Sequence, residues 1–425
     1  MSAAAGAIAR RGGGALAAAR TLDPRLPRAV WVIQAGMLAN SVGTGLLMPF
    51  VLIYLHDVRG FSLPVAGFVA GTFGAIGIVA SPLAGALIDR IGGRAIFVGS
   101  LTLLAGAYAL FPLVVRPWQA FVVIGLAGIG NGGLWPSQST LLLAVTPAER
   151  RHAAFAVNRM VGNLGLGLGA LVGGVAIAGA GGHTFTVLFL VDAATFLVFA
   201  AAGLTVQPPA PAPAGDAKPG RYADVLRDRT FVAFVLLNTL FVAVGYAQLE
   251  AAVPIFAKHQ AGLDEAAIGS VFLANVLTVV VAQLPVVRLL EGRRRMRLLA
   301  VMACLWACSW ALVAGAGAWS TAGLSTALVG IAVVVFGLGE CLHGPLSATV
   351  AADLAPERLR GRYMALSTNS FAVGFALGPI AAGAVLGAQP AALFPAAALL
   401  CVLAGGAALA LERRLPAAAR ITASR

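Results

Sequence analysis

The stretch QPPAPAPAGDAKPG, residues 207–220, divides this 425-residue chain into two halves of the same kind. Proline and glycine at this density end a helix, so we expect an extended linker here. Each half consists of long apolar runs separated by short polar loops. The whole chain is 60% apolar and 11% charged, whereas soluble domains are roughly 45–50% apolar and about 25% charged. These proportions indicate a chain that lies mostly within a lipid bilayer.

The apolar runs are long enough to cross a bilayer, which takes about 20 residues of helix. The roughly ten-residue alternation of a membrane barrel is missing, so we predict helices rather than strands. The sequence therefore predicts an all-α integral membrane protein with twelve transmembrane helices, six on each side of the linker. Their expected bounds are 29–55, 64–88, 95–115, 118–145, 153–181, 184–206, 230–256, 266–290, 296–317, 320–352, 362–387 and 391–411.

The expected organisation has five parts. They are an N-terminal tail (1–28), an N-terminal six-helix bundle (29–206), a linker (207–229), a C-terminal six-helix bundle (230–411) and a C-terminal tail (412–425).

Basic residues set the expected orientation. Of the 29 Lys and Arg residues, Arg59, Arg116 and Lys258 fall in loops opposite the N-terminus, Arg159 falls within a span, and the rest lie on the N-terminal side. Lys and Arg accumulate on the cytoplasmic side of membrane proteins. We therefore expect a multi-pass protein of the cell membrane, with both termini in the cytoplasm. Because the orientation in the membrane explains the net charge of +13, no nucleic-acid partner is expected. The Ala- and Arg-rich composition indicates a bacterial source.

The two halves repeat each other in one ungapped register, at an offset of 209 residues. A duplicated six-helix unit predicts two bundles related by a pseudo-two-fold axis along the membrane normal, with ligand sites between them near mid-membrane. The matching pairs are Gly130 with Gly339, Pro136 with Pro345, Pro147 with Pro356, Arg151 with Arg360, Ala156 with Ala365, Gly165 with Gly374, Gly169 with Gly378 and Gly174 with Gly383.

The stretch GALIDRIGGR, residues 85–94, connects the second and third spans. Gly85 permits close helix contact, Gly92 permits a tight turn, and Asp89 and Arg90 place opposite charges at the membrane boundary. The stretch resembles the loop signature of the major facilitator superfamily, Gly-x-Leu-Ala-Asp-Arg-x-Gly-Arg-Lys. It departs from that signature at Ile88 and Gly93, and conservatively at Arg94.

The resemblance extends over the whole chain and implies the fold of that superfamily. It also implies that Asp89 and Arg90 join a charge network that closes the cytoplasmic gate, together with Gly85, Gly92 and Arg94. The alternative is a solvated turn whose charges only set the orientation.

The fifth span carries GNLGLGLGALVGG, residues 162–174. Glycines every three or four residues let a neighbouring helix approach closely. The stretch resembles the antiporter motif of the drug-exporting branch, which ends Gly-Pro-x-x-Gly-Gly, although Ala170 replaces the proline. General helix packing is the open alternative. The candidate packing residues are Gly165, Gly169, Gly173, Gly174, Gly374, Gly378 and Pro379.

Another motif of the superfamily would place an arginine at Ile124, where this chain has none. That arginine is tied to proton coupling in many exporters.

Charges at membrane depth are costly, so they usually face a cavity or a partner. Glu340 lies near the middle of the tenth span, and His343 follows on the same helical face. The resemblance assigns this span to the cavity wall, where a carboxyl group can take up and release a proton or hold a cationic substrate. Glu250 in the seventh span is the second candidate. For Glu340 and His343, a structural hydrogen bond between helices is the alternative.

The other polar groups within spans are weaker candidates. Asp192 lies in the sixth span, which is peripheral in this fold, so helix support is the favoured role. Arg159 in the fifth span could pair with a carboxylate, bind an anion or extend toward the cytoplasm. Asn40 in the first span could donate a hydrogen bond to a substrate or join neighbouring helices.

The sequence thus favours a transporter of the superfamily that exports small amphipathic or cationic compounds in exchange for protons. The alternative is an importer or facilitator of a sugar or other small metabolite. No phosphate-binding loop is present, so the energy would come from a gradient. We expect no enzyme activity, cofactor or metal, since the four cysteines lie within spans at no metal-binding spacing. The expected partners are a small-molecule substrate, protons and the lipid bilayer, and we expect a monomer.

Overall fold

The computed structural model describes residues 26–180, 183–207, 222–289, 291–318, 322–356, 359–416 and 420–422. The expected N-terminal tail and most of the linker therefore lie outside the described residues. Within them the chain is almost wholly helical, and extended pairing is limited to one isolated bridge between Arg294 and Ile421.

Twelve helices in the described part of the chain are long and apolar enough to cross a membrane, and they match the expected spans within a few residues. The all-α prediction is confirmed. The first half contains α2 (Arg28–Leu47), η1 (Met48–Phe50), α3 (Val51–Ile53), η2 (Tyr54–Val58), α4 (Leu63–Ile91), α5 (Gly93–Leu110), η3 (Phe111–Leu113), α6 (Pro117–Ala144), η4 (Ala148–Arg150), α7 (Arg151–Ala180) and α8 (His183–Thr205).

The second half begins with a short helix, α9, which follows the linker region. The elements are α9 (Tyr222–Leu226), α10 (Arg229–Val244), α11 (Tyr246–His259), α12 (Glu265–Leu289), α13 (Arg295–Ala318), α14 (Ala322–Leu354), α15 (Arg360–Ala388), η6 (Pro390–Ala392) and α16 (Leu393–Glu412).

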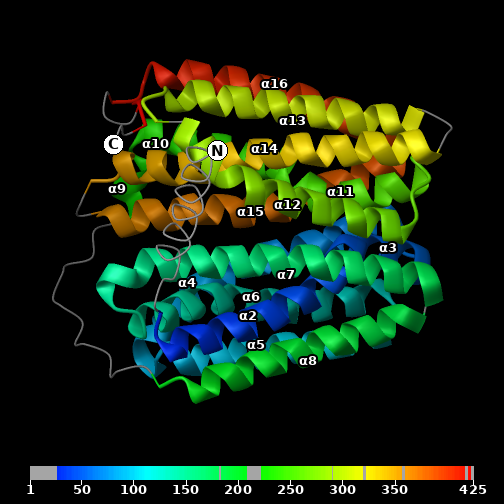
Figure 1. Cartoon of the computed structure of the whole chain (residues 1–425), viewed down its shortest axis with the longest axis horizontal. Coiled ribbons are helices and arrows are strands. Elements are labelled where there is room, and N and C mark those ends of the chain that lie inside the picture. Colours follow the sequence, from blue (N-terminus) through cyan, green and yellow to red (C-terminus); the bar gives the residue numbers. More distant parts are fainter. Residues whose placement is uncertain are drawn as a thin grey trace, which may run out of the picture.

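The helices form two bundles, one from each half of the chain (Figure 1). In the first, α2 packs on α7 and α8, α4 packs on α6, and α5 packs on α6 and α8. In the second, α10 packs on α15 and α16, α12 packs on α14, and α13 packs on α14 and α16. Each contact has its counterpart six spans later, so the predicted pseudo-two-fold symmetry is confirmed.

Glycines paired by the sequence repeat make equivalent contacts within the two bundles. A Cβ at Gly165 on α7 would lie 2.6 Å from the Ser41 Cβ on α2. A Cβ at Gly374 on α15 would likewise lie 2.6 Å from the Val242 Cβ on α10. In both cases the missing side chain lets two helices approach closely.

A second repeat pair joins the two bundles to each other. A Cβ at Gly174 on α7 would press against the carbonyl oxygen of Glu265 on α12. A Cβ at Gly383 on α15 would press against the carbonyl oxygen of Leu63 on α4. The halves therefore meet along α7 with α12 and along α4 with α15, which are symmetry-related contacts.

The molecule has two ends because successive helices run in opposite directions. The proximal end carries the start of α2, the α4–α5 connection and the end of α16; the distal end carries the η2–α4 and α11–α12 connections. The contacts between glycines of one bundle and the backbone of the other lie between the middle of the helices and their distal ends. Gly67 on α4 meets the Pro379 carbonyl on α15, and Gly269 on α12 meets the Ala170 carbonyl on α7.

Candidate functional site

The seventh span is broken where the sequence predicts a continuous helix. Gly245 separates α10 from α11 with φ −105° and ψ −94°. The carbonyl groups released by the break have side-chain donors: Trp310 Nε1 donates to the Val244 oxygen at 2.8 Å, and Gln248 Nε2 donates to the Ala243 oxygen at 2.9 Å. A broken helix in a membrane needs such substitutes for its backbone hydrogen bonds.

The corresponding span of the other half, the first, is also interrupted, after the 20 residues of α2 as against the 16 residues of α10. Helix α2 ends at Leu47, and η1 follows with Pro49 in its first turn. Interrupted helices in corresponding spans of two repeats are typical of a transporter's binding site. Both interruptions border the same cavity.

This cavity lies between the bundles and has a volume of about 120 Å³. Its wall is mainly apolar, with five polar side chains. Ligand pockets for drug-sized molecules are usually about 300–1,000 Å³, so the cavity has room here for water or a small cation, and a larger molecule would require it to widen. The lining residues are Gly45, Met48, Pro49, Asn163, Leu166, Gly167, Ala170, Tyr246, Leu249, Glu250, Phe272, Asn275, Val276, Val279 and Glu340.

Two of the predicted residues, Glu250 and Glu340, line this cavity from α11 and α14. Asn275 on α12 donates from Nδ2 to Glu340 Oε2 at 2.8 Å and to the Val333 carbonyl oxygen at 3.3 Å, which orients the carboxylate. Glu250 makes no hydrogen bond or ion pair with any described residue. The structure thus brings two carboxylates into one small, mostly apolar space.

Arg159 reaches toward this region from the opposite bundle. Its Nη2 lies 3.0 Å from the position of a Cβ at Gly344 on α14, and its charge acts electrostatically on Glu340. No carboxylate oxygen of a described residue lies within ion-pair distance of the guanidinium. Arg159 therefore lies near the cavity without neutralising either carboxylate by direct contact.

His343 lies one helical turn from Glu340 but away from the cavity lining. It is fully buried among the rings of Phe241, Tyr246, Trp306 and Phe371. Neither ring nitrogen has a hydrogen-bond partner among the described residues. This aromatic surrounding is suited to a neutral imidazole that fills space.

Asp192 and Asn40 lie inside the first bundle, away from the cavity lining. Asp192 on α8 is fully buried, and its Oδ1 accepts a hydrogen bond from Thr195 Oγ1 at 3.2 Å. The same oxygen faces Gly43 on α2, where a Cβ would lie 2.6 Å away. Asn40 is also buried, and its Nδ2 has no partner among the described residues. This placement links Asp192 to contact between α2 and α8.

The loop with the predicted gate residues lies at the proximal end. Gly92 ends α4 with φ +88°, a conformation that favours glycine. Arg94 Nη2 donates to the carbonyl oxygen of Leu204 at the end of α8. Asp89 and Arg90 are exposed and form no ion pair with described residues, and a Cβ at Gly85 would meet open space.

The remaining predicted packing residues lie at helix contacts. Gly169 and Gly173 on α7 leave room for backbone carbonyl groups of α2. Gly378 on α15 leaves room for Ala247 on α11, and the Pro379 carbonyl group lies against Gly67 on α4.

Sequence reasoning missed two amides in the cavity wall, Asn163 and Asn275, and the helix break at Gly245. A single asparagine inside the apolar run FLANVLTVV is a usable signal for Asn275. Asn163 was hidden in a glycine-rich motif. The break had no clear signal, since glycine is frequent throughout these helices.

Comparisons with known proteins agree with this architecture. An uncharacterized MFS-type transporter of Bacillus subtilis, YhjO, is 26% identical over 88% of this chain and 90% of its own length. The multidrug resistance protein MdtH of Cronobacter sakazakii is 26% identical over 79% of this chain and 81% of its own length.

Solved structures share the fold at low identity. A single-residue mutant of the nucleoside transporter NupG superposes with a TM-score of 0.75 at 14% identity, covering 90% of this chain and 100% of that one. A peptide transporter of the POT type in complex with sulfate gives a TM-score of 0.76 at 17% identity, covering 91% of this chain and 95% of that one. The model of the Major Facilitator Superfamily matches residues 35–335 and 235–425. With two symmetric bundles and a cavity between them, the chain belongs to the Major Facilitator Superfamily of membrane transporters.

Proposed function

We propose that this transporter exports small amphipathic or cationic compounds in exchange for protons, by alternating access. The observation that carries the proposal is the pair of carboxylates, Glu250 and Glu340, in one mainly apolar cavity between the bundles. The apolar wall suits the body of an amphipathic molecule, and the carboxylates suit its positive charge.

The two carboxylates supply a simple basis for exchange. Two negative charges in one small cavity repel each other, and either a proton or a cation relieves that repulsion. A site neutralised by protons attracts a cation less, so proton and substrate compete for the same groups. If the cavity opens alternately to the two sides of the membrane, this competition couples the outward movement of substrate to the inward movement of protons.

The conformation supports alternating access. The contacts between glycines of one bundle and the backbone of the other lie toward the distal ends, whereas the proximal gate residues Asp89 and Arg90 form no ion pair with described residues. The concentration of Lys and Arg at the proximal end supports a cytoplasmic location for that end. We take this state to be closed outward, with its inner gate released.

The similarity to MdtH, a protein named for multidrug resistance, favours export of varied compounds. The relation is distant at 26% identity, so the substrate itself has to be found by experiment.

The test uses liposomes with a pH-sensitive dye inside and a panel of lipophilic cations added outside. We expect substrate-driven proton flux in wild type, and loss of most of it in Glu340→Gln and Glu250→Gln. Glu149→Gln is the matched control, because Glu149 is an exposed carboxylate at the proximal end. Unchanged flux in both cavity variants would refute the assigned sites. Absence of flux with every cation, but uptake of a sugar or metabolite, would favour the import alternative.

A further inference from the structure

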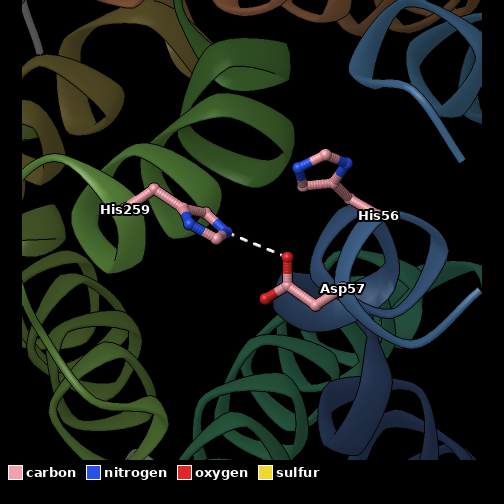
Figure 2. Close-up of side chains that lie close together, drawn as sticks. All are labelled: His56, Asp57 and His259. Atoms are coloured by element: carbon pink, nitrogen blue, oxygen red, sulfur yellow. Dashed lines mark hydrogen bonds and ion pairs between the residues drawn. The ribbon is translucent and has the colours of Figure 1, made fainter. Parts of the chain in front are cut away.

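A cluster of polar side chains joins the two bundles at their distal ends, outside the lining of the cavity. Figure 2 shows His56 and Asp57 on the blue ribbon of η2, with His259 at the end of α11 across from them. One potential ligand atom from each residue lies within 4.8 Å of the others. We propose that these three residues form a site for a Zn²⁺-type cation, which holds the distal ends of the two halves together.

The local backbone prepares the first two ligands. Residues Tyr54–Val58 form a π-helical turn, a rare conformation that is frequent at functional sites. The chain then turns through Gly60, with φ +69°, and places the Phe61 carbonyl oxygen 2.7 Å from His56 Nδ1. If Nδ1 carries the proton and donates it to this carbonyl, Nε2 keeps a free lone pair. A backbone carbonyl that fixes the imidazole in this way is typical of metal-binding histidines.

The third ligand comes from the other bundle. His259 Nε2 lies 2.9 Å from Asp57 Oδ1, so imidazole and carboxylate already meet across the gap. Zn²⁺ would take the place of the hydrogen between them, and the neutral ring would then carry its hydrogen on Nδ1. The His259 side chain is 40% exposed and has freedom to adjust. Zn²⁺ binds imidazole nitrogen and carboxylate oxygen at about 2.0–2.2 Å, which places tetrahedral ligand atoms about 3.3 Å apart. The His259 Nε2 and Asp57 Oδ1 atoms therefore need to separate slightly, and no pair of ligand atoms needs to draw together by more than about 1.5 Å, with water as fourth ligand.

Neighbouring charges permit a cation here. Lys258 Nζ lies 2.7 Å from Asp57 Oδ2 and 2.8 Å from Glu265 Oε1. Lys258 thus binds Oδ2 of Asp57, leaves Oδ1 for the metal, and orients the carboxylate. Because Glu265 offsets the lysine charge, the cluster keeps one net negative charge when both histidines are neutral.

A metal bound at this place would act on the conformational equilibrium. Its ligands come from both halves, so the complete site exists only while the distal ends are together. A ligand that binds one conformation more tightly shifts the population toward it. Zn²⁺ should therefore stabilise the distally closed state and slow any cycle that must open this end.

The binding test uses the full chain, purified without a histidine tag, stripped with EDTA and titrated with ZnCl₂. We expect one Zn²⁺ per wild-type chain and a rise in thermal midpoint at about 100 µM Zn²⁺. His56→Ala and His259→Ala should each weaken binding by about 100-fold. His183→Ala is the matched control, because His183 is an exposed histidine at the distal start of α8, outside the cluster.

A second measurement separates metal binding from simple loss of structure. His56→Ala leaves the Lys258–Asp57 ion pair in place, so its distal end should close normally without metal. Spin labels at Val115→Cys and Gln389→Cys, one in each half at the distal end, should report a smaller open population when Zn²⁺ is added to wild type. Zn²⁺ should change nothing in His56→Ala.

Three results would overturn the proposal: no Zn²⁺ binding by wild type, undiminished binding in both histidine variants, or binding that leaves the label distance unchanged. None of these readouts requires transport, so failure of the proposed export function would leave them interpretable.

Discussion

The ion pair between Lys258 and Asp57 offers a direct way to change the conformational equilibrium. Asp57 belongs to the first bundle and Lys258 to the second, and their charged atoms lie 2.7 Å apart. Replacing Asp57 by Asn removes this link and the contact with His259. We expect Asp57→Asn to increase the population of molecules whose distal ends are apart.

The size of the expected shift follows from the geometry of this ion pair. Two unit charges at this distance attract by about 6 kcal/mol at an effective dielectric constant of about 20. Solvent reduces that attraction, because the Lys258 and Asp57 side chains are 28% and 21% exposed. Exposed ion pairs contribute about 0.2–1 kcal/mol to stability, and hydrogen bonds to charged groups contribute about 1.5–3 kcal/mol. Lys258 keeps Glu265 in the variant, so no charge is left alone. A net loss of about 1–2 kcal/mol, or about 5–30-fold in population, is expected.

The assay is the distance between spin labels at Val115→Cys and Gln389→Cys, measured in EDTA. The background replaces the four free cysteines by alanine. Glu265→Gln is the matched control, because it removes a carboxylate 2.8 Å from the same lysine but within the same bundle. Glu265→Gln should leave the open population unchanged or lower it.

Two outcomes would refute this reasoning. If Asp57→Asn leaves the distance distribution as in wild type, the ion pair contributes nothing to closure. If Glu265→Gln opens the distal end as much as Asp57→Asn does, the effect comes from Lys258 itself and not from a link between the halves.

Three further substitutions test the cavity, the packing and the buried histidine. Asn275→Ala should reduce proton flux in liposomes by about tenfold, the equivalent of about 1.4 kcal/mol, because Glu340 loses the donor that orients it; flux equal to wild type would show that this hydrogen bond is dispensable. Gly67→Ala should disfavour distal closure by about 1–3 kcal/mol in the label assay, since its methyl group meets a carbonyl of the other bundle, while Gly85→Ala should have no such effect. His343→Leu should keep or raise the thermal midpoint, because it removes two buried nitrogens without partners among the described residues, each costing about 1–3 kcal/mol; a clear fall would reveal a bond to this ring.

Much of the architecture follows from the sequence because bilayer thickness fixes the length of each apolar helix. The helix bounds, the division into two six-helix units and the symmetry of their contacts all agree with the expectations. The repeat register was informative because glycine is needed wherever two backbones approach closely, and Gly165 and Gly374 do make equivalent contacts.

The cavity was only partly predictable. Burial of a charge in a membrane is costly, so sequence alone could mark Glu250 and Glu340 as candidates. The same cost applies to any membrane-buried polar group, whatever it faces, so Asp192 and His343 carried a similar signal. Only the packing of the helices shows that the first two share a cavity while Asp192 lies within one bundle and His343 among aromatic rings.

The sequence by itself determined that the chain crosses the membrane twelve times as two copies of one unit, since hydropathy and repetition are local properties of the chain. The tertiary structure decided which residues of the two six-helix units are in contact. The break at Gly245 depends on the donors supplied by Trp310 and Gln248, and the distal cluster unites Asp57 with His259, 202 residues apart. These contacts depend on how the two bundles pack against each other, and no local sequence pattern encodes that packing.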